Sequence, residues 1–138
     1  EIPLGKGNIV RSGKDVTLAT YSIMVSKSIE AAKIVKDKHN IDVEIIDLQT
    51  IRPLDKDLII NSVKKTNRLI TVEESWPFNR VGSEIAFIIQ YTAFDYLDAP
   101  IKKINSADVP MPYSSVLEKQ YLPQVEDIII AIEEVCYI

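Results

Sequence analysis

Paired carboxylates are the side chains of this sequence that come nearest to an acid–base arrangement. They occur as Glu73-Glu74, Glu126-Asp127 and Glu133-Glu134. Two carboxyl groups held close together can divide the roles of general acid and general base. The last two pairs lie in helical patterns, where adjacent side chains point in different directions. Glu73 ends a β-prone run, a better position for function, although capping of the next loop is the simpler role for it.

Histidine and cysteine, two residue types that often act in catalysis, each occur once in this chain. His39 lies in a polar stretch without a second histidine or cysteine nearby, so a triad or a metal site has nothing to build on. Cys136 is the only cysteine, and we expect it to pack in the core. Asp47 ends a β-prone run like a phospho-acceptor aspartate, but the acidic cluster that would hold Mg²⁺ is missing. We therefore predict no catalytic residue, cofactor contact or metal ligand in these 138 residues.

Glycine-rich phosphate loops are absent from the sequence. The four glycines are Gly5, Gly7, Gly13 and Gly82. None belongs to a G-x-G-x-x-G or G-x-x-x-x-G-K-S/T pattern, in which backbone N–H groups approach a phosphate. We therefore do not expect a nucleotide site.

Charge is unevenly distributed along the chain. Residues 1–83 carry 13 Lys/Arg against 11 Asp/Glu, whereas residues 84–138 carry 3 against 9. An acidic C-terminal part repels phosphates and opposes nucleic-acid binding. It suits a basic protein partner, although acidic residues can also serve only to keep a surface soluble.

The last predicted helix ends in negative charge. Glu133 and Glu134 lie in its final turn, and the carboxylate of Ile138 follows. Negative charge at a helix C-terminus opposes the macrodipole by roughly 0.3–1 kcal/mol per group. We expect a cationic partner to offset this charge.

Strand and helix patterns alternate through the sequence. β-prone runs cover residues 16–21, 43–48, 68–73 and, more weakly, 101–105, and helical spacing of apolar residues covers 23–38, 56–66, 81–92 and 124–136. This alternation predicts an α/β domain with a mostly parallel sheet. The stretch 106–123 contains Pro110, Pro112 and Pro123, and we expect it to be irregular. No apolar run approaches the roughly 20 residues of a membrane span.

Several motifs appear together in one order along the chain. They are I-P-L-G-K at 2–6, E-I-I-D-L-Q-T-I-R-P-L-D at 44–55, V-E-E-S-W-P at 72–77, V-G-S-E-I at 81–85, L-D-A-P at 97–100, A-D-V-P-M-P-Y at 107–113 and L-P-Q-V at 122–125. With them the chain resembles the C-terminal (transketolase C-terminal) domain of the β subunits of pyruvate dehydrogenase E1. The stretch 74–80 departs from the family pattern, which often carries glycines there.

The resemblance implies one domain over 1–138, an excised part of a longer E1 β chain. It implies a three-layer α/β/α fold on a five-stranded, mostly parallel sheet, with residues 8–11 as an antiparallel edge strand. The parent enzyme decarboxylates pyruvate and transfers acetyl to lipoyl groups of the E2 acyltransferase, in the bacterial cytoplasm or the mitochondrial matrix. Its thiamine diphosphate and Mg²⁺ would lie outside this domain.

The resemblance also implies contact residues. Asp98 and the Ile138 carboxylate would bind basic residues of the peripheral subunit-binding domain of E2. The candidates for contacts with the E1 α subunit and the second β subunit of an α2β2 assembly are Arg52, Trp76, Pro77 and Tyr113. Two alternatives stay open: the equivalent domain of a branched-chain dehydrogenase or another transketolase-like enzyme, and a stand-alone small-molecule-binding α/β domain. The A-D-V-P-M-P-Y segment favours pyruvate over branched-chain substrates.

Overall fold

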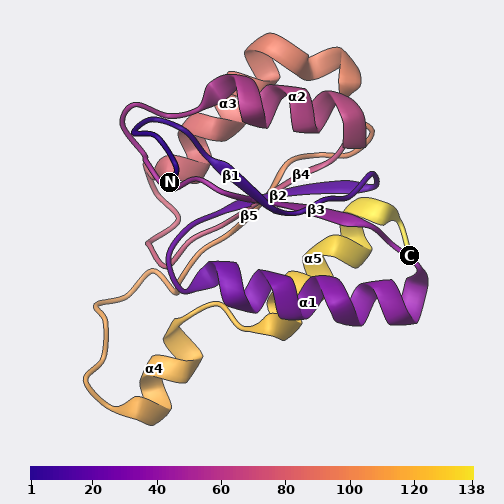
Figure 1. The fold of residues 1–138 in the computed structure, drawn as a ribbon. Coiled ribbons are helices and arrows are strands. Elements are labelled where there is room, and N and C mark those ends of the chain that lie inside the picture. The colour runs from indigo at the N-terminus through magenta and orange to yellow at the C-terminus, as the bar shows by residue number, and fades with distance from the viewer.

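A five-stranded sheet runs through the centre of the computed structural model, which describes residues 1–138 (Figure 1). In spatial order the strands are β1 (Asn8–Arg11), β3 (Val43–Asp47), β2 (Val16–Thr20), β4 (Leu69–Val72) and β5 (Lys102–Ile104). β1 pairs antiparallel with β3, and every other pairing is parallel. The predicted fold class and its antiparallel edge strand are therefore confirmed.

Helices cover both faces of this sheet. The helices of the chain are α1 (Met24–His39), α2 (Lys56–Thr66), α3 (Val81–Ala93), the short 3-10 helix η1 (Phe94–Tyr96), α4 (Ser115–Tyr121) and α5 (Val125–Cys136), of which α4 stands away from the sheet. α1 and α5 pack side by side on one face, whereas α2 and α3 pack on the other (Figure 1). This arrangement gives the three layers that the resemblance implied.

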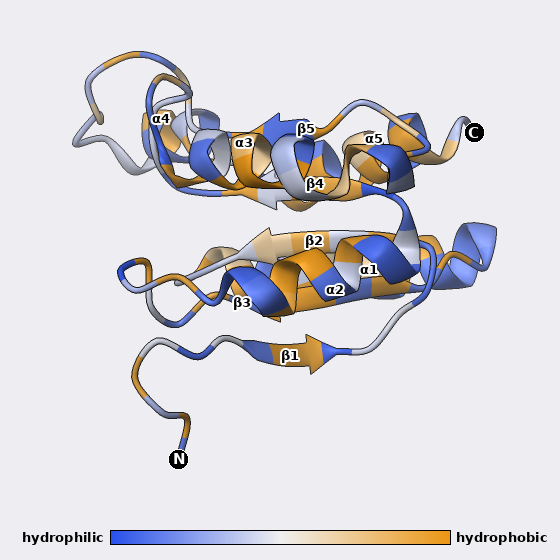
Figure 2. Cartoon of the chain, turned by 90° about the horizontal axis from the view of Figure 1, so that it is seen from above, coloured by the Kyte–Doolittle hydropathy of each residue, from blue (hydrophilic) through white to orange (hydrophobic).

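The sheet has a separate hydrophobic core on each face. Leu18, Ile45 and Ile70 point toward α1 and α5, and their neighbours Ala19 and Ile46 point toward α2 and α3. Since side chains alternate along a strand, a strand buried on both faces needs a continuous apolar run. β2 (VTLAT) and β3 (VEIID) come near this pattern, with mostly apolar residues and few polar ones, and β2 is orange to pale in Figure 2. The central strands were predictable for this reason.

One helix was not predicted. α4 forms at Ser115–Tyr121, inside the stretch 106–123 that we expected to be irregular. Pro110 and Pro112 precede this helix and Pro123 follows it, so no proline interrupts its hydrogen bonds. That prediction was wrong because it extended the effect of the prolines over seven residues that contain none.

The direction of the strands sorts the loops into two groups. The loops at 48–55, 73–80 and 105–114 follow the carboxyl ends of β3, β4 and β5. The chain before Asp98 and the end of α5 lie instead near the amino ends of the parallel strands. No helix is both long enough and apolar enough to cross a bilayer.

Candidate functional site

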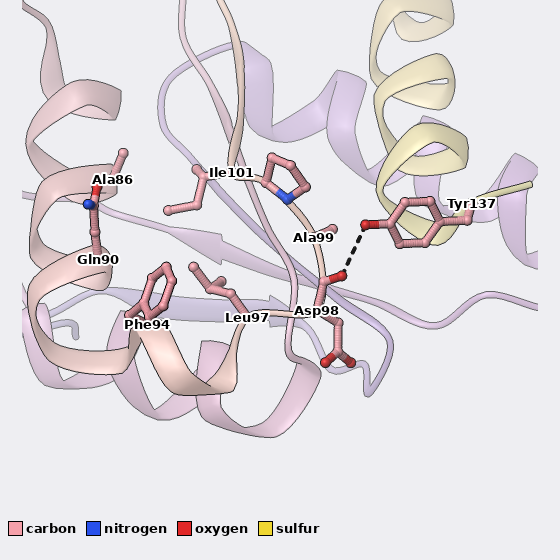
Figure 3. A pocket seen from close by; sticks show the side chains of 9 residues that line it. Ala86, Gln90, Phe94, Leu97, Asp98, Ala99, Ile101 and Tyr137 are labelled. Atoms are coloured by element: carbon pink, nitrogen blue, oxygen red, sulfur yellow. Dashed lines mark hydrogen bonds between the residues drawn. The ribbon is translucent and has the colours of Figure 1, made fainter.

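The two residues predicted to dock a partner, Asp98 and Ile138, lie at the same end of the sheet. The carbonyl oxygen of Asp98 accepts a hydrogen bond of 3.1 Å from the Tyr137 hydroxyl (Figure 3). Ile138 borders a shallow cavity whose lining includes Asp15 and Arg68, which flank the starts of β2 and β4. We call the region formed by Asp98, Tyr137 and Ile138 the amino-end surface.

Tyr137 holds an unusual backbone conformation at this surface. Its φ is 59°, in the left-handed region, where a non-glycine residue costs roughly 1–2 kcal/mol. The N–H of Tyr137 donates to the carbonyl of Glu134, and the N–H of Ile138 donates to that of Glu133. These two bonds form the Schellman ending of a helix. The turn directs the Tyr137 ring across to Asp98, a contact that sequence reasoning missed.

A cleft of about 550 Å³ opens beside Asp98 (Figure 3). Its lining is mostly apolar and consists of Ala86, Gln90, Phe94, Leu97, Asp98, Ala99, Pro100, Ile101 and Tyr137. Phe94 and Tyr137 are 64% and 69% exposed, so both rings are available to a partner. The Asp98 carboxylate forms no ion pair within the chain. A cation with an aliphatic stem matches this combination of an apolar wall and a free carboxylate.

The acidic end of α5 is neutralised inside the molecule. Glu133 accepts hydrogen bonds from Lys38 Nζ at 2.9 Å and His39 Nε2 at 2.8 Å, and Glu134 pairs with Lys102. The hydrogen bonds from Lys38 and His39 lower the pKa of Glu133. We expected a partner to supply this positive charge. For Glu133 and Glu134 the expectation was wrong, because α1 and β5 already bring three basic side chains to them. For the Ile138 carboxylate it stays a prediction.

The four subunit-interface candidates lie at the opposite end of the sheet. Arg52, Trp76, Pro77 and Tyr113 belong to the three loops that follow the carboxyl ends of β3, β4 and β5. We call the region formed by these four residues the carboxyl-end surface. Tyr113 is fully exposed and Trp76 is 41% exposed.

Hydrogen bonds hold the Trp76 loop in place. Trp76 Nε1 donates to the carbonyl of Val109 at 2.9 Å, and Lys103 Nζ donates to the carbonyl of Pro77, also at 2.9 Å. The guanidinium of Arg80 lies over the Trp76 ring, 5.6 Å from its centroid. Trp76 is therefore not a core residue but a half-exposed ring that ties the loop after β4 to the loop after β5.

A second cleft, of about 780 Å³, lies beside Arg52. Arg80, Lys56 and Glu84 share its lining, so it is mostly polar. No three His, Cys, Asp or Glu side chains are grouped in a way that could hold a metal ion. The carboxyl-end surface therefore offers charged and aromatic groups for contact.

Glu73 is buried at the carboxyl end of β4, against the start of α3, rather than exposed at a loop. Its side chain is 2% exposed and accepts hydrogen bonds from Tyr21, Ser75 and the backbone of Gly82. Burial, followed by the nearby Glu73 charge, raises the pKa of Tyr21. Sequence reasoning considered Glu73 but missed Tyr21 and Gly82, because residues 52 and 9 positions away meet it only in the folded sheet.

Comparison with known proteins extends these observations. The domain family described as "Transketolase, C-terminal domain" matches residues 5–128. The pyruvate dehydrogenase E1 component subunit beta of Rickettsia felis is 52% identical over 99% of the chain, which spans 41% of that protein. The mitochondrial subunit beta-2 of Oryza sativa subsp. japonica is 49% identical over 99% of the chain, here 36% of the relative's length.

A solved structure matches the fold. It is titled "Split gene transketolase, inactive beta4 tetramer" and superposes with a TM-score of 0.84 and 26% identity, over 99% of this chain and 43% of that one. Both kinds of comparison cover this chain from end to end and less than half of the matching protein. The chain therefore belongs to the transketolase C-terminal domain family, and along its whole length it resembles the β subunits of pyruvate dehydrogenase E1.

Proposed function

We propose that this chain is the assembly and E2-docking domain of a pyruvate dehydrogenase E1 β subunit. The observation that carries this is the 52% identity to such a subunit over 99% of the chain. In the parent enzyme, pyruvate is decarboxylated and its acetyl group passes to a lipoyl group of E2. Thiamine diphosphate and Mg²⁺ supply the decarboxylation chemistry and are held outside this domain. The chain positions the parts of the complex and contributes no catalytic residue.

The amino-end surface is the docking site in this proposal. Asp98 and the Ile138 carboxylate pair with basic residues of the peripheral subunit-binding domain of E2. The cleft beside Asp98 deepens this contact, because a lysine or arginine stem can pack against Phe94 and Tyr137 while its cationic head reaches the carboxylate. The excess of acidic residues in 84–138 supports a basic partner, since complementary charge steers association.

Binding of the isolated chain to an E2 subunit-binding domain tests the docking role. We expect binding that weakens as salt is raised, and a loss of about tenfold or more in affinity for Asp98→Lys, measured by calorimetry. Asp108→Lys, which changes an exposed aspartate outside the cleft, is the matched control and should bind like the wild type. Equal affinities for the wild type and Asp98→Lys would contradict the assignment of Asp98.

The aromatic walls of the cleft need a separate measurement. Phe94→Ala should weaken binding several-fold and leave its salt dependence unchanged, because it removes contact area but no charge. Wild-type affinity for Phe94→Ala, together with weak binding by Asp98→Lys, would leave the docking site in place and remove the cleft from it.

The carboxyl-end surface is the assembly site in this proposal. Arg52, Trp76, Pro77 and Tyr113 contact the E1 α subunit and the second β subunit of an α2β2 heterotetramer. The exposure of Tyr113 and Trp76 supports this, because tyrosine, tryptophan and arginine are enriched at the centres of protein interfaces. The parent enzyme works in the bacterial cytoplasm or the mitochondrial matrix, in keeping with relatives from both sources.

The equivalent domain of a branched-chain dehydrogenase is the second candidate. The identity of about 50% to several pyruvate dehydrogenase subunits favours the first proposal. Activity of the complete E1 enzyme on pyruvate and on branched-chain 2-oxo acids separates the two. Faster turnover of a branched-chain acid would overturn the choice of pyruvate.

A further inference from the structure

The neighbouring strands β2 and β4 form a topological switch point, the place in the sheet where the connections leave in opposite directions. They are parallel neighbours, yet α1, which follows β2, and α3, which follows β4, lie on opposite faces. In open α/β sheets, the crevice outside the carboxyl ends of two such strands is the usual place for a ligand. Tyr21 follows β2 directly and Glu73 follows β4 directly, so both residues stand in this crevice.

The carboxylate of Glu73 is surrounded by donors. Oε1 accepts from Ser75 Oγ at 2.5 Å and from Tyr21 Oη at 3.4 Å, and Oε2 accepts from the backbone N–H of Gly82 at 2.5 Å. Gly82 is the second residue of the 13-residue helix α3, whose N-cap, Arg80, forms no side-chain capping bond. The positive end of the helix dipole therefore meets a carboxylate that comes from a neighbouring strand.

Gly82 permits this close approach. A Cβ atom at position 82 would lie 2.6 Å from Glu73 Oε2 and 2.5 Å from Thr71 Oγ1. Anion-binding loops use a glycine at a helix start in the same way, because it lets backbone N–H groups reach the anion. Thr71 Oγ1, which lies against the same side of Gly82, is buried without a hydrogen-bond partner, so a further polar group borders the place where the carboxylate meets the helix start.

We propose that the crevice between β2 and β4 is an anion-binding site for a small carboxylate, and that the side chain of Glu73 permanently occupies it. The hydroxyls of Tyr21 and Ser75 and the Gly82 N–H at the start of α3 bind the anion, and the carboxylate of Glu73, which follows β4, is the anion that they bind. The occupied crevice also fixes the start of the loop at 75–80, which carries Trp76 and Pro77. This inference does not depend on the proposed docking or assembly roles, because it concerns only groups inside this chain.

Replacement of Glu73 tests the proposal through chemical rescue. Glu73→Ala deletes Cγ and the carboxyl group, which together have the shape of acetate. We expect the Tm of the variant to fall by about 5–10 °C in chloride, because three donors lose their acceptor. Sodium acetate at about 0.2 M should then raise its Tm by about 3 °C relative to sodium chloride of equal ionic strength, by binding the folded state only.

Four controls make the result decisive. The wild type and Glu74→Ala, which removes the adjacent carboxylate, should show no acetate-specific shift, and an uncharged molecule of similar size, acetamide, should rescue Glu73→Ala less than acetate. An equal acetate shift in the wild type, Glu74→Ala and Glu73→Ala would overturn the proposal.

If Glu73→Ala does not fold in chloride, recovery of its near-ultraviolet circular dichroism in acetate supports the site, and failure to recover it counts against the site. Glu73→Gln, which retains the acceptor oxygen, should fold and show no acetate response, and an acetate-specific shift in that variant would contradict the proposed occupancy.

Discussion

Glu44 is a single residue whose charge the fold has to stabilise. Its side chain is 1% exposed and accepts hydrogen bonds from Ser62 Oγ at 2.7 Å, from the Gly13 N–H at 3.2 Å and from Lys65 Nζ. Burial alone raises the pKa of Glu44, but the bonds from Lys65, Ser62 and Gly13 outweigh it and lower the pKa overall. The charged form is therefore the one that the folded state favours.

This pKa shift predicts a dependence of stability on pH. A carboxyl group whose pKa is lower in the folded state stabilises the fold above its unfolded pKa of about 4.3, and this contribution is lost as pH falls through the folded pKa. We expect Glu44→Gln to lower the free energy of unfolding by about 1–3 kcal/mol at pH 7. Urea denaturation from pH 7 to pH 3 should show the difference from wild type shrinking toward acid. A constant difference at every pH would contradict the role of the charge.

Tyr137 illustrates a residue that carries strain. Its left-handed backbone is a position where glycine is the common residue, while its ring reaches the carbonyl of Asp98. Tyr137→Phe removes only the hydroxyl and should cost about 0.5–1.5 kcal/mol of stability. Tyr137→Gly relieves the strain but loses the ring, so its stability measured by urea denaturation should lie near that of Tyr137→Phe. A loss well above 2 kcal/mol in Tyr137→Phe would show that the hydroxyl has a larger role.

The residue scale also marks where sequence reasoning stops. Asp98 and Trp76 could be proposed from the family resemblance, but the partners that define their surroundings could not. Tyr137 meets Asp98 from 39 positions away, and Lys38 meets Glu133 from 95 positions away. Such pairs depend on how α1, β5 and α5 pack, which local patterns do not specify. The cations that we expected a partner to bring to Glu133 and Glu134 were for this reason found inside the molecule.

At the scale of elements, the bounds of the helices were predicted most closely. The helix predicted over 56–66 is α2, and its N-cap Asp55 accepts from the Leu58 N–H at 3.4 Å. α5 begins with a capping box between Gln124 and Asp127. The other predicted helices differ from α1, α3 and α5 by one residue at their ends. Apolar periodicity predicts such elements because their buried faces are continuous.

Removal of the Asp55 cap should weaken the whole domain. The same carboxylate also accepts from the Gly7 N–H at 3.2 Å and lies 3.7 Å from Lys6 Nζ, so it joins the N-terminal segment to α2. Asp55→Ala should lower the free energy of unfolding by about 1–2 kcal/mol in urea denaturation. Asp57→Ala, in the first turn of the same helix, is the control and should cost about 0.3–1 kcal/mol. Equal losses in both variants would mean that the cap contributes nothing specific.

At the scale of the whole molecule, the sheet separates two surfaces. The amino-end and carboxyl-end surfaces lie at opposite ends of parallel strands, with both hydrophobic cores between them (Figure 1). The three layers and the antiparallel edge strand were predictable from the alternation of elements and the family resemblance. The division of the six candidate residues into a docking pair and four interface residues came from the family resemblance. That the two groups lie at opposite ends of the sheet was not predicted, because it required the position of each loop on the strands.

This separation predicts that docking and assembly can be disrupted independently. In a complete E1 enzyme, Tyr113→Asp should reduce the formation of α2β2, seen by analytical ultracentrifugation, because it places a charge in the proposed interface. The same variant of the isolated 138-residue chain should bind the E2 subunit-binding domain with wild-type affinity. Asp98→Lys should show the reverse pattern. Loss of both properties in either variant would mean that the two surfaces are coupled or that the variant misfolds.

β5, one of the two edge strands of the sheet, has a consequence for the protein at high concentration. It is only three residues long, and two of them are lysines. Lys102 pairs with Glu134, while Lys103 donates to Ser83 and to the Pro77 carbonyl. Short strands with lysines do not readily template the addition of a strand from another molecule. The β5 border of the sheet is thereby protected against adding a strand from a neighbouring molecule, even where the protein is crowded.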